Sequence, residues 1–154
     1  MESIVECLTS QDDFEGRLAR IFLYTKTFVL DAKVTNRIRI DQLSKAEKTM
    51  LGIKFEEMFK LQFGISKSQQ LDCLIAGKEV DVKFTCRNNW MIPPKCFDQI
   101  CLLARMDDEK FSFGIIQATK DSLTKSANWD RKKQICLSGR GNIHWLFKDK
   151  QLYT

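Results

Sequence analysis

The sequence predicts an α/β fold in which helices flank a β-sheet. Residues 13–27 and 44–63 repeat apolar side chains every three or four positions, the spacing of amphipathic helices. Between residues 71 and 119 the apolar side chains instead alternate or form short runs, as in strands. With 154 residues and 44% hydrophobic content, the chain can bury a core and fits one domain, 1–154. We expect a helical part at about 13–64, a sheet at about 70–120 and a basic part at about 121–154.

The first predicted helix covers residues 13–27. Its apolar face consists of Phe14, Leu18, Ile21 and Phe22. Its basic residues, Arg17, Arg20 and Lys26, fall mostly on the solvent side. The next segment, 28–40, is ambiguous, because its β-branched residues and its alternation of arginine with isoleucine favour a strand, while a linking loop fits equally well.

The second predicted helix has a start and a stop signal. Ser44 and Glu47 match a capping box, and Gly64 follows where a helix commonly ends. Its apolar stripe is formed by Leu51, Phe55, Met58 and Phe59. Glu56 and Glu57 lie beside this stripe, so one of them can turn towards the strands that follow, and the alternative is that both are solvated surface charges.

Residues 71–85 read as two short strands joined at Gly77-Lys78. In the second strand, apolar Val80, Val82 and Phe84 alternate with Asp81, Lys83 and Thr85. Asp81 and Lys83 therefore project from one face of the strand, and Asp72 reaches them from the neighbouring strand. Such charges are seldom buried unless they are paired or bind metal, so the three residues suggest a metal site. An exposed, solvated face is the competing interpretation.

The rest of the chain extends the predicted sheet. A loop at residues 86–90 leads to Pro93-Pro94, which ends any strand. The apolar runs 97–106 and 111–119 are separated by a polar turn at 107–110 and fit an antiparallel hairpin.

Composition restricts the possible functions. Lys and Arg number 25 against 20 Asp and Glu, a formal charge of +5 that favours phosphate backbones without proving such a partner. The six cysteines lack CxxC pairs, so we expect reduced, mostly buried thiols. The only histidine, His144, excludes sites that need two imidazoles. Neither a signal peptide nor a run of about 18 apolar residues is present, which predicts a soluble, cytoplasmic protein without membrane contact.

Two carboxylates on a divalent cation, with a lysine close by, supply what phosphodiester hydrolysis needs. The cation polarises the phosphoryl oxygen, and the ammonium orients the attacking water or stabilises negative charge. Magnesium is the expected ion because the ligands are hard oxygens.

The residues also resemble a known family, the NaeI-type restriction endonucleases of the PD-(D/E)xK nuclease superfamily. The resemblance covers about residues 45–147. It is carried by Glu56, Leu71-Asp72, Ile75-Ala76-Gly77, Val80-Asp81-x-Lys83, Trp90-Met91-Ile92-Pro93-Pro94, Cys101-Leu102-Leu103, Phe113-Gly114-Ile115-Ile116, Ala127-Asn128-x-Asp130, Gly139-Arg140 and Trp145-Leu146. The Trp90–Pro94 string is its most specific part. Leu71 replaces the superfamily's proline before the first aspartate, a substitution that this family tolerates.

The resemblance implies a restriction-endonuclease-like core with a mixed sheet flanked by helices. It implies that Glu56, Asp72, Asp81 and Lys83 occupy the four catalytic positions. Asp72 and Asp81 would then hold Mg²⁺, for which Mn²⁺ can substitute, together with the Val82 carbonyl. Glu56 would bind metal-bound water or a second ion, and Lys83 would position the nucleophile. Effector-stimulated cleavage, which belongs to a further domain of the family, is not transferred.

We therefore predict a magnesium-dependent restriction-type endonuclease that acts on double-stranded DNA as a homodimer. The alternatives are a repair, mobile-element or toxin nuclease of relaxed specificity, and a DNA-binding module that does not cut. The candidate DNA contacts are Arg87, Asn88, Asn89, Arg131, Lys132, Lys133 and Arg140. A solvated basic face is an equally open interpretation of these residues. The three tryptophans, Trp90, Trp129 and Trp145, are expected in core or hinge packing.

Overall fold

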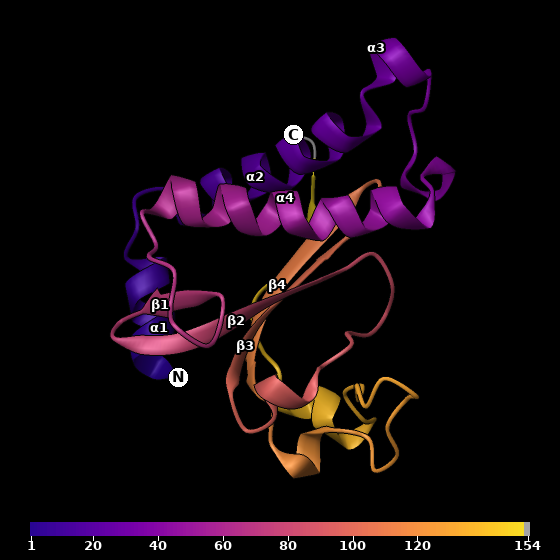
Figure 1. Ribbon diagram of the computed structural model, residues 1–154. Coiled ribbons are helices and arrows are strands. Elements are labelled where there is room, and N and C mark those ends of the chain that lie inside the picture. Colours follow the sequence, from indigo (N-terminus) through magenta and orange to yellow (C-terminus); the bar gives the residue numbers. More distant parts are fainter. Residues whose placement is uncertain (153–154) are drawn as a thin grey trace.

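The computed structural model describes residues 1–152 and contains a five-stranded sheet in the order β1-β2-β3-β4-β5 (Figure 1). The strands are β1 Cys73–Ile75, β2 Lys78–Thr85, β3 Ile100–Met106, β4 Lys110–Gln117 and β5 His144–Gln151. Strands β2 and β3 run parallel, whereas the other neighbouring pairs are antiparallel. The sheet is therefore mixed, and helices flank it, as the sequence predicts.

Two long helices, α2 (Phe14–Leu30) and α4 (Lys45–Phe63), lie side by side across one face of the sheet (Figure 1). Shorter helices are α1 (Glu2–Thr9) and α3 (Ala32–Thr35). Short 3-10 helices are η1 (Ile40–Gln42), η2 (Pro94–Cys96), η3 (Lys120–Ser122) and η4 (Ser138–Asn142). No helix in residues 1–152 has both the length and the apolarity needed to cross a bilayer.

Helix α4 begins and ends where its sequence predicts. The Ser44 hydroxyl accepts a hydrogen bond from the Glu47 backbone N–H at 3.2 Å, and the Glu47 carboxylate accepts one from the Ser44 N–H at 3.0 Å. Gly64 follows with φ 61°, a left-handed conformation that glycine adopts without steric penalty. These caps fix the position of the helix that carries Glu56.

Phenylalanines join the two long helices to the sheet. The ring centroids of Phe22 and Phe55 are 4.6 Å apart, those of Phe22 and Phe111 4.9 Å, and those of Phe59 and Phe113 5.6 Å. All five side chains are fully buried. Burial of such a side chain contributes about 1.5–3 kcal/mol, so this layer supplies much of the stability of what we call the helix-covered face.

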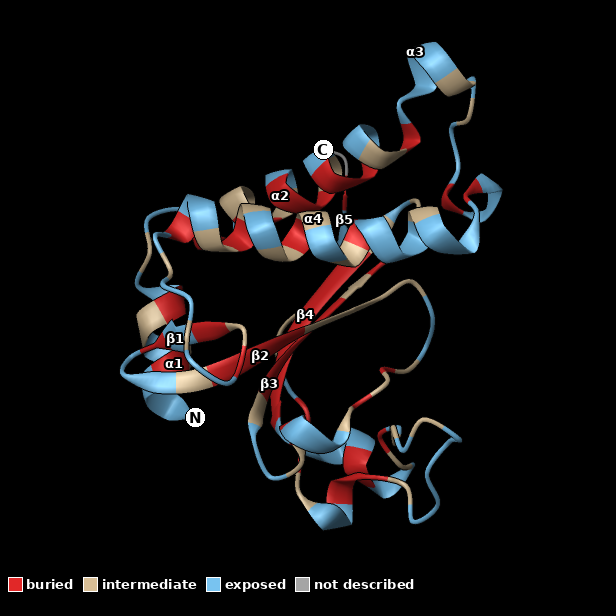
Figure 2. Cartoon of the chain, in the orientation of Figure 1, coloured by how far each residue is buried: buried red, intermediate tan, exposed pale blue. Residues whose placement is uncertain are grey.

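The opposite face, here called the loop-covered face, carries a second and smaller core. It consists of Leu71, Trp90, Ile92, Cys96, Cys101, Leu103, Ile116, Ala118, Leu123, Ile135 and Ile143. Segments 86–99 and 118–143 cover it with little regular structure (Figure 2). Two isolated β-bridges, Ile92 to Lys133 and Leu123 to Ile135, help to hold these segments in place.

Strand register assigns each residue to a face. Val80, Val82 and Phe84 belong to the helix-covered core, so the alternating Asp81 and Lys83 point to the loop-covered face. Lys83 pairs with Leu103, Leu103 with Gly114, and Gly114 with Trp145. Residues paired across neighbouring strands point to the same side. These four residues therefore form one row across the loop-covered face.

Both predicted hairpins are present. Strands β1 and β2 are joined by Ala76 and Gly77, with φ of 52° and 75°, which suits a two-residue turn one position earlier than the expected Gly77-Lys78. Strands β3 and β4 form the second hairpin, with the turn at residues 107–109.

Two local expectations are wrong, and one open alternative is decided. Segment 28–40, ambiguous between a strand and a linking loop, contains no strand, because α2 continues to Leu30 and α3 and η1 follow. Lys26 is buried rather than solvated, since its ammonium lies 3.2 Å from the Asp108 carboxylate. Trp129 is 96% exposed and packs in no core. The buried Trp90 does pack against Trp145, with ring centroids 6.1 Å apart.

All six cysteines are free, as expected from their spacing. Cys73, Cys96 and Cys101 are buried, and the other three are partly buried. Helix α1 and strand β5 were not predicted from the sequence. Ile4 and Leu8 of α1 are fully buried in the helix-covered core, so this helix belongs to the fold rather than to a free end.

Gly139 gives a test of the loop-covered face. A Cβ atom at this position would lie 2.2 Å from the Ser122 carbonyl oxygen, whereas nothing lies within 4 Å of one at Gly141. Because backbone must move to admit the methyl group, we expect Gly139→Ala to destabilise the fold by about 1–3 kcal/mol. That corresponds to roughly 2–4 °C in Tm per kcal/mol, measurable by circular dichroism. Gly141→Ala is the control, and equal Tm values for the two variants would contradict the close packing.

Candidate active site

The site is organised around two charged residues of β2. The Asp81 side chain is 0% exposed, and the Lys83 ammonium lies 2.7 Å from its Oδ2 atom. Both side chains point to the loop-covered face because they are two positions apart in one strand. The predicted sharing of one face is therefore present as a buried ion pair.

The carboxylate of Asp81 has unused hydrogen-bonding capacity. The Lys83 ammonium, at 2.7 Å, is the partner of Oδ2, whereas Oδ1 has no hydrogen-bond partner among residues 1–152. Buried carboxylate oxygens almost always have donors or cations as partners. Asp81 is thus suited to receive a further positive group.

Asp72 joins Asp81 across the edge of the sheet. Strand β1 pairs with β2 only as far as Val80, so the backbone of Val82 extends beyond its partner strand. The Asp72 carboxylate takes the place of that partner and accepts a hydrogen bond from the Val82 N–H at 3.0 Å. The N–H and C=O of one strand residue point to the same edge, so the Val82 carbonyl faces this open edge as well.

The pKa values of the two carboxylates are shifted in opposite directions. Burial, together with the charges of Asp81 and Glu56, raises the pKa of Asp72 to about 6, although the Val82 N–H opposes the shift. Burial also favours a neutral Asp81, but the hydrogen-bonding and charge interactions with Lys83 prevail and lower the pKa of Asp81. The pKa of Lys83 is raised by Asp81 despite burial. Lys83 therefore remains an ammonium at neutral pH.

Of the two glutamates on α4, Glu56 is the one near the site. Its charge helps to raise the pKa of Asp72, and its carboxylate lies 2.8 Å from the Lys60 ammonium. The Glu57 side chain is 62% exposed and pairs with Lys54 instead. The basic partner Lys60 was not foreseen, although its spacing of four residues from Glu56 is a common helical pairing.

In residues 1–152, no three His, Cys, Asp or Glu side chains converge closely enough to hold a metal ion. The available cation ligands are accordingly the two carboxylates of Asp72 and Asp81 and the backbone carbonyl of Val82, with Glu56 at longer range.

The loop after β2 separates its polar residues into different environments. Arg87 and Asn88 are exposed, but the Asn89 amide is engaged inside the molecule. The Asn89 side chain donates to the Ile135 carbonyl at 2.9 Å and accepts from the Trp90 and Ile135 N–H groups. Its hydrogen bonds fix the loop to segment 118–143.

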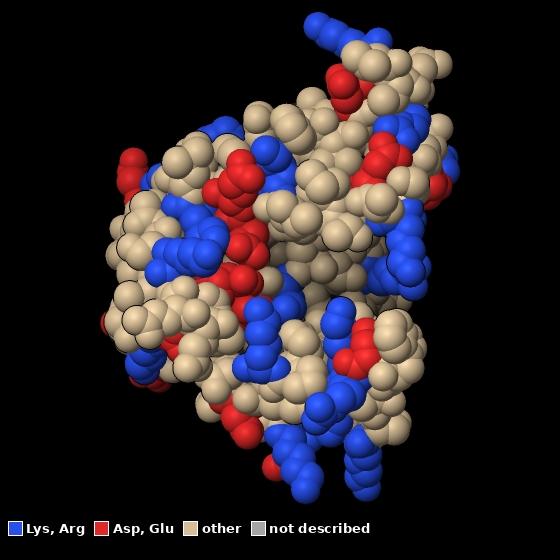
Figure 3. Space-filling view, viewed as in Figure 1, with Lys and Arg blue, Asp and Glu red and all other residues tan. Residues whose placement is uncertain are grey.

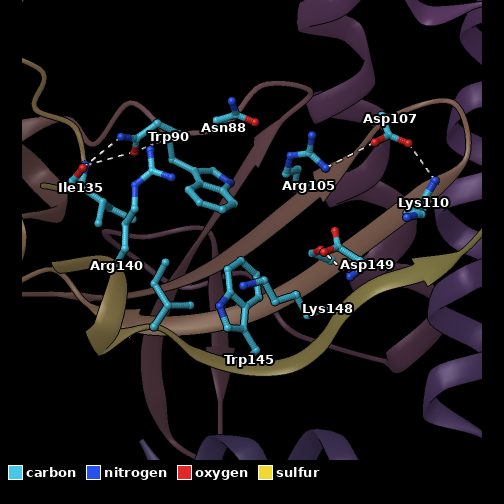
Figure 4. A pocket seen from close by; sticks show the side chains of 13 residues that line it. Asn88, Trp90, Arg105, Asp107, Lys110, Ile135, Arg140, Trp145, Lys148 and Asp149 are labelled. Carbon is cyan, nitrogen blue, oxygen red and sulfur yellow. Dashed lines mark hydrogen bonds and ion pairs between the residues drawn. The ribbon is translucent and has the colours of Figure 1, made fainter. Parts of the chain in front are cut away.

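The C-terminal basic residues are spread over the loop-covered side. Arg131 is exposed, Lys132 lies 3.8 Å from Asp130, and the Lys133 ammonium stands 5.4 Å from the centre of the Phe97 ring. Exposed Arg140 lies apart from them, at a cavity beside Trp90 (Figure 4). Figure 3 shows a hollow between the helical layer and the loop-covered part, with Lys and Arg side chains along its rims.

Sequence reasoning missed the cavity beside β3, β4 and β5. Its volume is about 380 Å³, and its lining includes Asn88, Trp90, Arg105, Arg140, Trp145 and Lys148 (Figure 4). Arg105 occupies the same face as Cys101 and Leu103 in an otherwise apolar strand. That single charge at an alternating position was the available signal, of the same kind as Asp81.

Comparison with known proteins relates the chain to restriction endonucleases. A family model described as "Restriction endonuclease NaeI" matches residues 2–154. The chain is also similar to the Type II restriction enzyme NaeI of Lentzea aerocolonigenes, with 30% identity over 152 residues. The alignment covers 97% of this chain and 48% of the relative, so the chain spans about half the length of the curated relative it matches.

Because the pKa of Asp72 is raised, the stability lost when this carboxyl becomes charged depends on pH. Since folding raises this pKa to about 6, the folded state retains a proton that the unfolded state loses, and the contribution of Asp72 to stability falls as pH rises towards 6. We expect Asp72→Asn to raise the free energy of unfolding at pH 7.5 in chelator by about 1 kcal/mol after allowance for solvent screening, seen as a higher Tm, and to give less advantage at pH 4.

Thermal unfolding of both proteins across this pH range measures the difference. Glu57→Gln, which removes a surface carboxylate from the neighbouring helix layer, is the control. A gain in Tm that does not change with pH, or one that Glu57→Gln reproduces, would assign the effect to overall charge instead of Asp72.

Proposed function

Because the chain belongs to the NaeI restriction endonuclease family, we propose that it hydrolyses phosphodiester bonds in double-stranded DNA with the help of a divalent cation. The observation that carries the proposal is the buried Asp81, whose Oδ1 lacks a hydrogen-bond donor while Lys83 pairs with Oδ2 and Asp72 stands nearby. An ion pair kept for stability alone does not need a buried carboxylate oxygen without a donor, because burying such an oxygen is costly.

The residues present fit a divalent cation. Asp72, Asp81 and the Val82 carbonyl would hold it with hard oxygen ligands, for which Mg²⁺ is the preferred ion and Mn²⁺ a substitute. When bound, such an ion polarises a phosphoryl oxygen and lowers the pKa of coordinated water. A cation also offsets the mutual repulsion of Asp72 and Asp81, the repulsion that helps to hold Asp72 partly neutral at pH 6.

Lys83 supplies a fixed positive charge at the reacting phosphate. Its raised pKa keeps it protonated, so it serves as a hydrogen-bond donor and not as a base. From this position it orients the attacking water and stabilises the negative charge that develops on the phosphate. The ion pair with Asp81 limits the rotation of the ammonium, which lowers the entropic cost of aligning it.

Glu56 acts beside the direct cation ligands and is not one of them. Its carboxylate is shared with Lys60, so it is better placed to bind water near the cation, or a second ion, than to ligate the first ion directly. The charge it adds beside Asp72 strengthens the attraction of the whole group for a divalent cation.

We assign DNA contact to the loop-covered face. Exposed Arg87 and Asn88 leave β2 directly after the catalytic pair, and Arg131 and Arg140 extend the basic surface. Lys132 and Lys133 add charge close to it, whereas Asn89 holds the loop in place through its internal hydrogen bonds. Cutting both strands with one site per chain usually involves two copies, which supports a homodimer on DNA. The free cysteines suit a reducing, cytoplasmic location.

Plasmid cleavage tests the proposal. We expect linear DNA in the presence of Mg²⁺ or Mn²⁺ and none in chelator. Asp81→Ala and Lys83→Ala should each lower the rate at least about 10²-fold, because each removes an interaction with charge in the transition state. Direct formation of linear DNA, without accumulation of nicked circles, would support paired active sites.

Asp130→Ala provides the matched control, because Asp130 and Lys132 form a second aspartate-lysine pair two residues apart, outside the site. Its rate should equal that of the unchanged protein. A smear of fragments would favour a nuclease of relaxed specificity. Tight DNA binding without cleavage under either cation would refute the enzymatic proposal.

A further inference from the structure

We propose that the cavity lined by β3, β4, β5 and residues 88–90 holds one unstacked nucleobase of the bound DNA, an inference that rests on the proposed nuclease function. Nothing in the catalytic arrangement uses this cavity. Its chemistry nevertheless combines aromatic surface, amide groups and positive charge, the three features with which proteins hold an extruded or single-stranded base.

Two tryptophans give the cavity rigid aromatic walls. The Trp90 and Trp145 ring centroids are 6.1 Å apart, and the two planes are inclined by 45°. Trp90 is only 4% exposed, and its indole N–H donates to the Ala104 carbonyl at 3.0 Å, so its orientation is fixed. Trp145 is partly exposed and lines the cavity directly (Figure 4).

Gly114 allows Trp145 to occupy this position. A Cβ atom at Gly114 would lie 2.8 Å from Trp145 Cε3 and 3.1 Å from the His144 carbonyl oxygen. The indole therefore lies against bare backbone of β4, and the register of β4 and β5 is irregular at the same point. The local backbone is shaped to hold an aromatic ring at the wall of the cavity.

The polar lining suits a nucleotide. Arg105 is fixed by a hydrogen bond from its Nε to the Arg87 carbonyl at 2.8 Å and by Asp107, 3.5 Å from its Nη1. Within residues 1–152, Arg140 and Lys148 have no carboxylate partner. Four basic and two acidic side chains line the cavity, so its net charge is positive.

Asn88 and Asp149 complete the lining with groups that can address a base edge. The Asn88 amide offers both a donor and an acceptor, Arg140 offers paired donors, and the Asp149 carboxylate accepts from an exocyclic amine. Phosphate alone would need only the cations. The aromatic walls and the acceptors are explained by a base and are unfavourable for a bare phosphate.

Size and position agree with one nucleotide. A cavity of about 380 Å³ is at the lower end for small-molecule sites, and a duplex, whose major groove alone is about 12 Å wide, cannot enter it. Lys83 and Trp145 stand in one row separated by three strand spacings, about 14 Å in all. That is roughly four base-pair steps, so one short stretch of DNA can contact both.

Tryptophan fluorescence tests the proposal with the full chain. Trp129→Phe removes the exposed tryptophan and leaves Trp90 and Trp145 as the only reporters. This variant is titrated in chelator with a single-stranded DNA hexamer and with an abasic hexamer of equal charge. We expect the base-containing hexamer to quench the fluorescence and to bind about tenfold more tightly, because only it can stack on the accessible indole of Trp145. Equal affinity for both hexamers, without quenching, would overturn the proposal.

A pair of arginine variants separates base contact from phosphate contact. In the Trp129→Phe background, Arg140→Ala should abolish most of the preference for the base-containing hexamer. Arg131→Ala, which alters an exposed arginine outside the cavity, should weaken both hexamers alike. A tenfold preference that survives Arg140→Ala together with Asn88→Ala would place the base elsewhere and overturn the assignment.

The same experiments test the nuclease function independently of the base cavity. Metal-dependent cleavage by Trp129→Phe without base-dependent quenching would refute the base cavity and leave the nuclease function intact. Base-dependent quenching without metal-dependent cleavage would support the cavity and refute the nuclease function.

Discussion

The buried contact between Asp81 and Lys83 is the interaction around which the other parts of this molecule are arranged. Removing a carboxylate and an ammonium from water costs several kcal/mol for each ion, and their attraction seldom repays the whole cost. The pair therefore adds little to stability. The phenylalanine layer between the long helices and the sheet supplies the stability that allows a strand to carry these charges.

The two faces of the sheet divide these tasks between them. Helices cover one face with large apolar side chains, and Asp81 and Lys83 point away from that face. Irregular segments cover the other face. There, buried apolar residues lie beside polar groups that reach solvent. Loops suit this second face because they can present backbone carbonyls, amides and charged side chains in directions that a packed helix cannot.

Local signals explain what the sequence predicted correctly. Ser44 and Gly64 mark the ends of α4 within a few residues, and the alternation along β2 places Asp81 and Lys83 on one face without knowledge of the fold. Contacts between distant residues explain the errors. Lys26 is buried because Asp108, 82 positions away, pairs with it, and the backbone N–H of Ile40 donates to the same carboxylate.

The cavity residues could not be predicted from local sequence patterns, because strand pairing brings them together. Arg105 and Trp145 become neighbours only through the pairing of β3 with β4 and β4 with β5, which includes an irregular register that no local pattern reveals. The roles proposed for Glu56 and Asp72 rest on the family resemblance, because their local spacing alone leaves them ambiguous. The short β1 has one more consequence. Beyond Val80, β2 is an unpaired sheet edge, the kind of surface on which another chain can add a strand and begin aggregation. By accepting the Val82 N–H, the Asp72 side chain occupies a donor that an added strand would need, so the same carboxylate opposes strand addition at this edge.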